Sequence, residues 1–413
     1  GGLHAGGASG THNERMMTVL QDFKYYIPTH FVFGKDAEAQ VGAALSEDGI
    51  KKVLICRSSD AFLKTTGLLD RITGDLDAHG VAWVELDGIV PNPRLRRVYD
   101  GIALARAEQV DAVVAVGGGS VIDTAKAVAA GVLYDGDVWD FYSGKGRPKR
   151  ALPVAVVLTL PATGSESGGV SVVNNEDIHM KSLTSGDCLR PRYAFMDPKL
   201  CCTLPPFITS CGIADMLSHA MERYFTDSDE LNCIDYMCEG AMKAIVTFGR
   251  KVVRDPQNYD YRAEVMWLGT VAQNDMVGVG RNQDWSSHNI ANELSALYDT
   301  PHGASLTIIT PAWMRYVYKQ HLWRFARFAR VVFDVTEADD EKAALEAIRC
   351  TVAFFRDLNL PTSFEEFHIP TDRIDDMAET ASHAFGSDKI GTFMVLDKQD
   401  IIRIFEDSIQ KKE

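Results

Sequence analysis

Four residues in the second half of the chain have the types and spacing of metal ligands. Asp215 and His219 are four positions apart in the segment GIADMLSHAMERYF, whose apolar spacing predicts a helix. Their side chains would therefore project from one face of that helix. His288 and His302 bracket the segment HNIANELSALYDTPH. One carboxylate and three imidazoles suit Fe(II), Zn(II), Ni(II) or Co(II), whereas Mg²⁺ and Ca²⁺ prefer oxygen ligands.

The surroundings of Asp215 strengthen this hypothesis. The residue is flanked by Ile213, Ala214, Met216 and Leu217. A carboxylate buried among such side chains without a partner is costly, and a bound cation would offset that cost. A single histidine on an apolar helix is more often a structural core residue, so the prediction depends on all four residues together.

A glycine-rich turn in the first half is a candidate phosphate-binding loop. It lies between a predicted strand, Ala112–Val116, and a predicted helix, Ile122–Ala130. Glycines let a phosphate approach the backbone closely, and the N-terminus of the helix offers free N–H groups. The alternative is a turn that only connects the two elements. The candidate residues are Gly118, Gly119, Ser120 and Asp123.

A second turn, LTLPATGSE at residues 158–166, follows another predicted strand and supplies Thr159 and Thr163. Ligands of open parallel sheets collect outside the carboxyl ends of the strands. Two such turns therefore favour a nucleotide site more than one turn does. Neither turn matches the GxGxxG fingerprint, which indicates a variant form of dinucleotide binding.

The residues after the predicted strand Val53–Cys56 indicate which nicotinamide cofactor binds. An acidic residue there would accept a hydrogen bond from the ribose 2′-hydroxyl of NAD and repel a 2′-phosphate. The chain instead has Arg57, Ser58 and Ser59. Asp60, which follows them, complicates the prediction because it is acidic. Arg57 could form a charge-assisted contact with the phosphate. The sequence predicts NADP(H) over NAD(H), and a solvated Arg57 is the alternative.

Short apolar runs alternate with helical patterns in the first half of the chain. The runs are rich in Val, Ile and Leu with little alternation, which is typical of parallel strands buried on both faces. This βα pattern predicts a Rossmann-like parallel sheet covered by helices. The predicted strands are Val53–Cys56, Val81–Leu86, Ala112–Val116, Leu152–Leu160 and Tyr193–Met196.

Beyond residue 206 the long segments have helical spacing. The fold class is therefore an α/β N-terminal dinucleotide-binding domain followed by an all-α C-terminal metal-binding domain. We expect a leader or expression scar at 1–16, the α/β domain at 17–200 and the helical domain at 201–413. The predicted helices are Ile213–Phe225, Tyr261–Met276, Ser305–Tyr318 and Glu341–Leu358.

Composition excludes several classes of partner. The 413 residues are 46% hydrophobic and 24% charged, which is ordinary for a globular protein. The net charge of -15 argues against nucleic acid or an anionic membrane as the main partner. No apolar run approaches the roughly 20 residues that a membrane span needs. The 8 cysteines are scattered without a CxxC motif, which favours a reducing, cytoplasmic compartment.

Several segments together resemble the iron-containing alcohol dehydrogenase family, in particular its NADP(H)-dependent butanol dehydrogenase branch. The resemblance extends over nearly the whole chain after the leader. The segments are FKYYIPTHFVFG, the turn VPNP at 90–93, GGGSxxDxxK at 117–126, TGSE at 163–166, MDPKLCCTLPPFITSCGIADMLSHAMERY and DWSSHNIANELSALYDTPHG.

The resemblance implies residue roles in both halves. Asp215, His219, His288 and His302 would bind one divalent metal, Fe(II) first, with Zn(II) or Ni(II) as alternatives. The cofactor NADP(H) would contact residues of the first half, namely Asn92, Gly118, Gly119, Ser120, Thr159, Thr163 and Lys181.

One position departs from the family pattern. Many members carry a second histidine four residues after the first ligand of the last block, where this chain has Asn292. That histidine is a candidate proton-relay group. Asn cannot act as a general base, so the proton must pass through water, another residue or the cofactor ribose.

The predicted function is the metal-dependent interconversion of short-chain aldehydes and primary alcohols with NADP(H). A polyol dehydrogenase or a dehydroquinate-synthase-like enzyme of the same fold is one alternative. An inactive nucleotide-binding member is the other. The ligand blocks are flanked by Leu, Met, Trp and Tyr, which favours a small, fairly apolar substrate. A cytoplasmic homodimer is expected, without nucleic acid or membrane partners.

Overall fold

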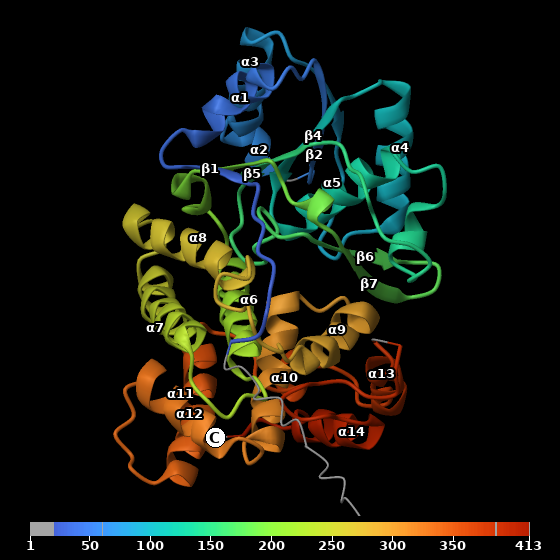
Figure 1. Cartoon of the computed structure of the whole chain (residues 1–413). Coiled ribbons are helices and arrows are strands. Elements are labelled where there is room, and N and C mark those ends of the chain that lie inside the picture. Colours follow the sequence, from blue (N-terminus) through green and yellow to red (C-terminus); the bar gives the residue numbers. More distant parts are fainter. Residues whose placement is uncertain (1–19, 60, 385, 413) are drawn as a thin grey trace, which may run out of the picture.

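The computed structural model describes residues 20–59, 61–384 and 386–412. A parallel sheet with its covering helices forms one half of the molecule, and a helical assembly forms the other (Figure 1). The predicted leader at 1–16 and Asp60 lie outside the described residues. The expected α/β and all-helical fold class is confirmed.

The sheet has six parallel strands in the order β1-β8-β5-β4-β2-β3. All five predicted strands are present within one to two residues of their expected ends, and β1 adds an edge strand. The central strands β4 and β5 are buried along their whole length. The bounds are β1 His30–Phe33, β2 Lys52–Arg57, β3 Ala82–Leu86, β4 Ala112–Gly117, β5 Val154–Leu158 and β8 Tyr193–Met196.

Helices cover both faces of the sheet, which explains why its strands are apolar throughout. Val53 and Ile55 of β2 pack in the cluster with α1 and α3, whereas Leu54 and Cys56 pack in the cluster with α4 and α5. Alternate side chains therefore enter different cores. The helices of this half are α1 Val41–Glu47, α2 Ala61–Thr65, α3 Leu68–Ala78, α4 Leu95–Ala107 and α5 Gly119–Val132.

A two-stranded antiparallel hairpin, β6 Val170–Asn175 and β7 Met180–Ser185, was not predicted from the sequence. Its strands mix Ser, Asn and Lys with apolar residues, so they lack the continuous apolar runs of the main sheet. The hairpin packs on α5, and β7 also contacts α9 of the helical half. It therefore lies where the two halves meet (Figure 1).

The helical half begins at α6, whose first residue is Pro206, a residue suited to the first turn of a helix. The four predicted helices correspond to α6, α8, α10 and α12. The helices are α6 Pro206–Tyr224, α7 Cys233–Arg254, α8 Tyr259–Gln273, α9 Ser286–Tyr298, α10 His302–Val317, α11 Leu322–Val332, α12 Asp340–Asp357, α13 Ile374–Ser382 and α14 Lys398–Asp407. Short 3-10 helices are η1 Ala37–Gln40, η2 Val138–Phe141, η3 Asp187–Leu189, η4 Pro198–Cys201 and η5 Glu365–Phe367.

Across the described residues, every helix is too short or too polar to cross a lipid bilayer.

A buried charge cluster ties three segments of the helical half together. Asp235 Oδ1 accepts from Arg281 Nη1 at 2.8 Å and from Arg324 Nη1 at 2.6 Å. The Asp235 side chain also belongs to a capping box at the start of α7. Burial by itself raises the pKa of Asp235, but the two guanidinium groups hold it below its ordinary value. The loop before α9, which leads to His288, is fixed by this cluster.

We expect Asp235→Asn to lower the free energy of unfolding by about 3–5 kcal/mol, because two buried arginines lose their counter-charge. Urea unfolding followed by circular dichroism measures the change. The matched control is Asp334→Asn, which removes an exposed partner of Lys243 and should change stability by less than about 1 kcal/mol. Equal losses in the two variants would contradict the assignment.

Candidate functional site

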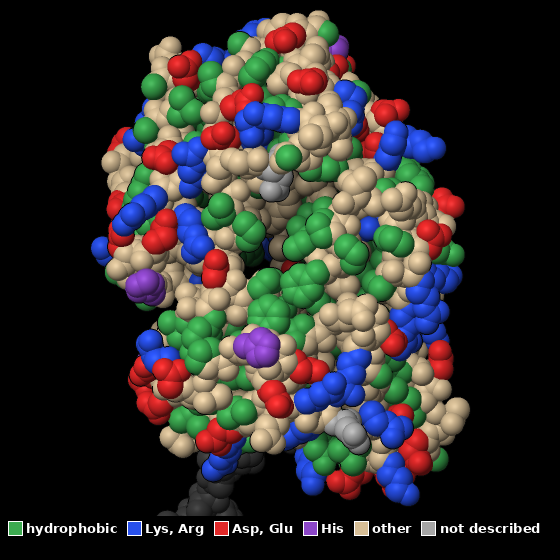
Figure 2. Space-filling model, turned by 180° about the vertical axis from the view of Figure 1, so that it is seen from behind, with side chains coloured by type: hydrophobic (Ala, Val, Ile, Leu, Met, Phe, Trp, Pro, Cys, Tyr) green, Lys and Arg blue, Asp and Glu red, His purple; other side chains and the backbone are tan. Residues whose placement is uncertain are grey.

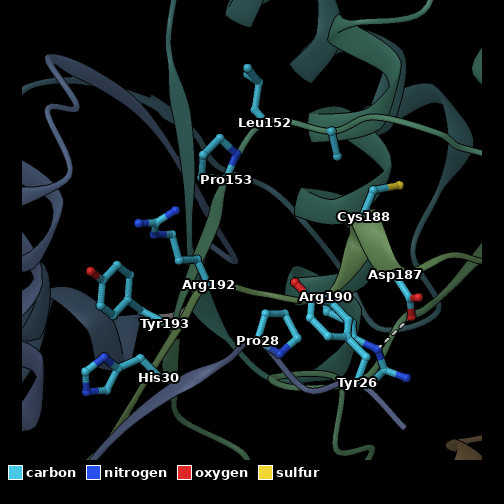
Figure 3. Close-up of a pocket in the computed structure, with 11 residues that line it drawn as sticks. Tyr26, Pro28, His30, Leu152, Pro153, Asp187, Cys188, Arg190, Arg192 and Tyr193 are labelled. Carbon is cyan, nitrogen blue, oxygen red and sulfur yellow. Dashed lines mark hydrogen bonds and ion pairs between the residues drawn. The ribbon is translucent and has the colours of Figure 1, made fainter. Parts of the chain in front are cut away.

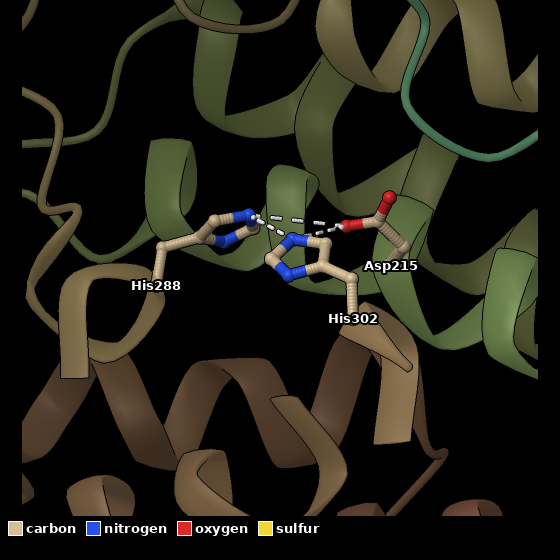
Figure 4. A group of neighbouring side chains, drawn as sticks. All are labelled: Asp215, His288 and His302. Carbon is tan, nitrogen blue, oxygen red and sulfur yellow. Dashed lines mark hydrogen bonds and ion pairs between the residues drawn. The ribbon is translucent and has the colours of Figure 1, made fainter. Parts of the chain in front are cut away.

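Three helices bring the predicted metal ligands together. Asp215 and His219 lie one turn apart on α6, His288 lies in the first turn of α9, and His302 is the first residue of α10. Figure 4 shows Asp215, His288 and His302 pointing toward one another from their separate helices. Asp215 and His219 are buried, whereas the two later histidines are half-buried.

The distances within this cluster fit a single divalent ion. Asp215 Oδ1 lies 3.3 Å from His219 Nε2, 3.5 Å from His302 Nε2 and 3.9 Å from His288 Nε2. Two ligands of a tetrahedral ion lie about 3.4 Å apart, since each bond is about 2.1 Å. Asp215 Oδ1 is buried and has no hydrogen-bond partner among the described residues.

His219 is the least central member of the set. Ligand atoms of Asp215, His288 and His302 all lie within 4.8 Å of one another, and His219 is not part of that group. Its ring stacks on His288, with centroids 5.0 Å apart. His219 therefore joins the cluster mainly through Asp215.

Burial dominates the electrostatics of the cluster. It raises the pKa of Asp215 to about 7, although the charge of His288 opposes this shift. It lowers the pKa of His219 and of His302 well below the ordinary value. Neutral imidazoles expose the lone pairs that a metal needs, and a cation would stabilise the ionised carboxylate.

Glu222 holds His288 in place and was not among the predicted site residues. Its Oε2 lies 2.7 Å from His288 Nδ1, while its Oε1 accepts from the backbone N–H of His288 and from Ser287 Oγ. This leaves Nε2 of His288 directed at Asp215. Burial lowers the pKa of His288, but the Glu222 carboxylate more than reverses that effect. The sequence signal is the position of Glu222, three residues after His219 on the same helix.

The predicted cofactor residues of the first half gather at one edge of the sheet. The chain winds outward from β2 to β3 on one side and from β4 through β5 to β8 on the other. The order reverses between β2 and β4, and ligands of such sheets bind outside the strand ends at this reversal. The predicted residues at or after the carboxyl ends of β2, β4 and β5 are Arg57, Ser58, Ser59, Gly118, Gly119, Ser120, Thr159 and Thr163.

The glycines of the β4–α5 turn are required by packing against the second turn. A Cβ atom at Gly118 would lie 2.9 Å from Leu160 Cβ. A Cβ atom at Gly119 would lie 2.5 Å from Thr163 Cγ2. The two turns therefore form one packed unit, and the phosphate-binding role of these glycines stays a prediction.

Asp123 points into the protein at the same turn. Its Oδ1 accepts from Ser165 Oγ at 2.6 Å and its Oδ2 from the backbone N–H of Val172 at 3.1 Å. Lys126 Nζ donates to Ser165 Oγ and to Gly168 O. Asp123 thus shapes the wall of the candidate site by holding the TGSE turn and the start of β6.

Arg57 is 6% exposed and already has an acidic partner. Its Nε donates to Glu85 Oε2 at 2.7 Å, and its Nη2 lies 3.9 Å from Asp87 Oδ2. The predicted alternative of a solvated arginine is therefore wrong. A contact from Arg57 to a 2′-phosphate would have to share the guanidinium with Glu85.

Asn92 and Lys181 lie where the two halves face each other. Asn92 has a positive φ of 56° and its Nδ2 donates to Asp299 Oδ1, at the end of α9. Lys181 lies on β7, where burial lowers its pKa to about 8 and the charge of Asp215 opposes that shift. Seen from behind, the surface is hollowed between the halves (Figure 2).

A pocket of about 390 Å³ lies elsewhere, at the amino ends of β1, β5 and β8. Figure 3 shows its lining, which includes His30, Pro153, Arg190, Arg192 and Tyr193. Ligands of parallel sheets bind at the opposite edge. This pocket is therefore separate from the candidate site.

Comparison with known proteins agrees with this arrangement. Residues 28–198 match the model of the iron-containing alcohol dehydrogenases, and residues 209–409 match the C-terminal model of the Fe-containing alcohol dehydrogenase family. The chain belongs to the iron-containing alcohol dehydrogenase family. The two matched regions correspond to the sheet half and the helical half.

Individual relatives of this iron-containing alcohol dehydrogenase cover most of its length. A probable NADH-dependent butanol dehydrogenase 2 of Bacillus subtilis is 37% identical over 94% of this chain and 100% of the relative. The NADPH-dependent aldehyde reductase YqhD of Escherichia coli is 34% identical over 84% of this chain and 89% of its own. The crystal structure of an NADH-dependent butanol dehydrogenase A from Thermotoga maritima is 36% identical, covers 95% of this chain and 99% of its own, and superimposes with a TM-score of 0.91.

We expect Glu222→Gln to weaken metal binding by roughly 10- to 100-fold, because His288 loses the carboxylate that orients its ring. Calorimetric titration of the metal-free protein with Zn(II) measures the affinity for the metal. Glu239→Gln is the control, since Glu239 is also buried but binds Tyr224 and Arg327 rather than a metal ligand. Unchanged affinity in Glu222→Gln would contradict the positioning role.

Proposed function

We propose that this iron-containing alcohol dehydrogenase interconverts short-chain aldehydes and primary alcohols by hydride transfer with a nicotinamide cofactor. The observation that carries the proposal is the cluster of Asp215 with three histidines in the helical half, together with a parallel sheet whose strand ends are suited to a dinucleotide. The names of the relatives, two butanol dehydrogenases and an aldehyde reductase, support the same reaction class.

Asp215, His219, His288 and His302 would hold one divalent ion, with Fe(II) preferred and Zn(II) or Ni(II) as alternatives. When bound, such an ion supplies Lewis acidity that polarises a carbonyl group. The protein's own contribution is position, because Glu222 fixes the His288 ring and the sheet half presents the cofactor.

The walls beside the cluster favour a small, fairly apolar substrate. The Trp285 ring meets His288 edge-on, with centroids 5.4 Å apart, and lies 5.9 Å from His219. The buried Arg223 guanidinium lies over the Trp285 ring, 4.8 Å from its centroid, and donates to the backbone oxygen of His219. Its charge is therefore used within the protein rather than offered to an anionic substrate.

We further propose NADP(H) as the preferred cofactor. The support is the pair Ser58 and Ser59 after β2, where a carboxylate would repel a 2′-phosphate. Arg97 donates to Asp87 Oδ1 and Arg57 Nη2 lies 3.9 Å from Asp87 Oδ2, so both arginines at this edge already have acidic partners. The homodimer and the cytoplasmic location stay predictions.

Protein stripped of metal by a chelator and then reloaded with a divalent metal should reduce butanal with NADPH. The metal-free protein should not reduce it. Fe(II), Zn(II) and Ni(II) are tested separately by the loss of NADPH absorbance. His302→Ala should lose activity with every metal, whereas His368→Ala, an exposed residue after η5, should not. Reduction of butanal without metal, or no reduction of butanal with any metal, would contradict the proposed reaction. Such a result would favour a polyol or dehydroquinate-synthase-like activity or an inactive protein.

Ser58→Asp should raise KM for NADPH roughly tenfold relative to KM for NADH, a difference of about 1.4 kcal/mol. The added carboxylate would repel the 2′-phosphate and accept from the 2′-hydroxyl of NADH. Steady-state kinetics with both cofactors measures the ratio. Ser143→Asp, a change at an exposed position after η2, is the charge-matched control. If the ratio of KM for NADPH to KM for NADH in Ser58→Asp equals that of the unmodified protein, position 58 does not determine the choice of cofactor.

A further inference from the structure

The pocket at the amino ends of β1, β5 and β8 has cationic side chains in its wall. Its volume of about 390 Å³ lies within the range of small-molecule sites, roughly 300–1,000 Å³. Arg190 and Arg192 come from the segment that leads into β8, and His30 begins β1 (Figure 3). Tyr193 also lines the pocket and stacks on His30, with ring centroids 5.8 Å apart. The pocket thus combines a hollow of ligand size with positive charge.

The two arginines of the wall are held in place by acidic and backbone partners. Arg190 Nε lies 3.3 Å from Asp187 Oδ1, and its Nη1 donates to the backbone oxygen of Ser167 at 3.0 Å. Arg192 Nε lies 2.5 Å from Asp48 Oδ2, yet the Arg192 side chain is still 56% exposed. Because these guanidinium groups are already ordered, an incoming anion would lose less entropy when it binds them.

A basic loop lies beside this pocket. Residues 145–150 (KGRPKR) follow η2 and lead directly into the lining residues 151–153. The loop packs on the pocket wall, since Cys188 Sγ donates to the backbone oxygen of Pro148 at 3.4 Å. Its exposed cations have no acidic partner among the described residues, namely Lys145, Arg147, Lys149 and Arg150. Positive charge without counter-charge therefore stands at the mouth of the pocket.

This concentration of positive charge contrasts with the rest of the chain, whose net charge is -15. A long polyanion or an anionic membrane would also meet the acidic remainder of the surface and be repelled. A compact anion instead interacts mainly with charges within about 8 Å, the screening length at physiological salt. The surroundings therefore favour a small ligand that carries several negative charges.

We propose that the pocket and the basic loop together form a second ligand site, which binds a compact polyphosphate group. Arg190 and Arg192 present planar guanidinium groups, whose geometry matches phosphate oxygens. Lys149 and Arg150, which directly precede the lining residues, supply charge for phosphates that extend out of the pocket. Free tripolyphosphate and the triphosphate of a nucleotide share this chemistry.

The proposed site is independent of the aldehyde and alcohol chemistry. It lies at the amino ends of the strands, whereas the candidate cofactor turns lie at their carboxyl ends. A ligand in the pocket would therefore leave the cofactor turns free.

Calorimetric titration of the full chain with tripolyphosphate at low salt tests the site. We expect one equivalent to bind, and Lys149→Gln/Arg150→Gln to weaken the binding roughly tenfold, because two charges beside the phosphates are lost. Both side chains are exposed, so the fold should be unaffected. Binding at the cofactor turns, or chelation of a bound metal, would give the same signal in the variant as in the unmodified protein.

The matched control is Lys342→Gln/Arg254→Gln. It also removes one lysine and one arginine that are exposed and have no acidic partner in the described chain, but both lie in the helical half. This variant should bind tripolyphosphate as the unmodified protein does. Arg192→Gln tests the wall of the pocket itself and should also weaken binding roughly tenfold.

Each outcome decides the question. Absence of tripolyphosphate binding, or equal affinity in Lys149→Gln/Arg150→Gln and the control, would overturn the proposal. Citrate that binds as tightly as tripolyphosphate would overturn the assignment to phosphate. Titration with ATP then distinguishes the two sources. ATP that binds more tightly than tripolyphosphate, with the same loss in the variant, identifies a nucleotide, and equal affinities identify free polyphosphate.

Discussion

The buried carboxylate of Asp215 is the constraint around which the site is arranged. It is 2% exposed, its Oδ1 has no hydrogen-bond partner in the described chain, and three imidazoles face it from three helices. An ionised carboxylate in such a place is unstable without a counter-charge. A cation bound in the helical half would therefore stabilise this carboxylate. Glu222 orients the imidazole of His288 toward Asp215.

The two halves contribute different things, and neither completes the site alone. The sheet half places its turns at the strand ends, and the helical half supplies the cluster of Asp215 and the histidines. The contacts between them are both polar and apolar: Asn92 and Arg94 bond to Asp299 at the end of α9, and Trp267 of α8 packs against Phe31 and Phe33 of β1. Strand β7 also brings Lys181 toward Asp215. A site shared between two halves can exclude water from the reacting groups while the cofactor and the substrate enter from different sides.

Much of this could be predicted from local patterns. The apolar strands around Val114 and Val156 follow from continuous apolar runs, and the position of Asp215 and His219 on one helix face follows from the helical period of 3.6 residues. The β6–β7 hairpin escaped prediction because its residues are polar and short strands are stabilised by their partners. The neutralised Arg57 escaped because Glu85 lies 28 positions away and on another strand.

The sequence by itself determined the strands of the main sheet except β1, several of the helices, and the types of the candidate ligands, because apolar patterning and metal preference are properties of individual residues and their near neighbours. It also determined that position 292 is Asn, where the family resemblance predicts a histidine. Only the tertiary structure decided which groups meet: Glu222 with His288, Asp123 with Ser165, and Lys181 with Asp215 and Glu293. Those pairings depend on long-range packing and on the burial that shifts each pKa, and neither is encoded in local spacing.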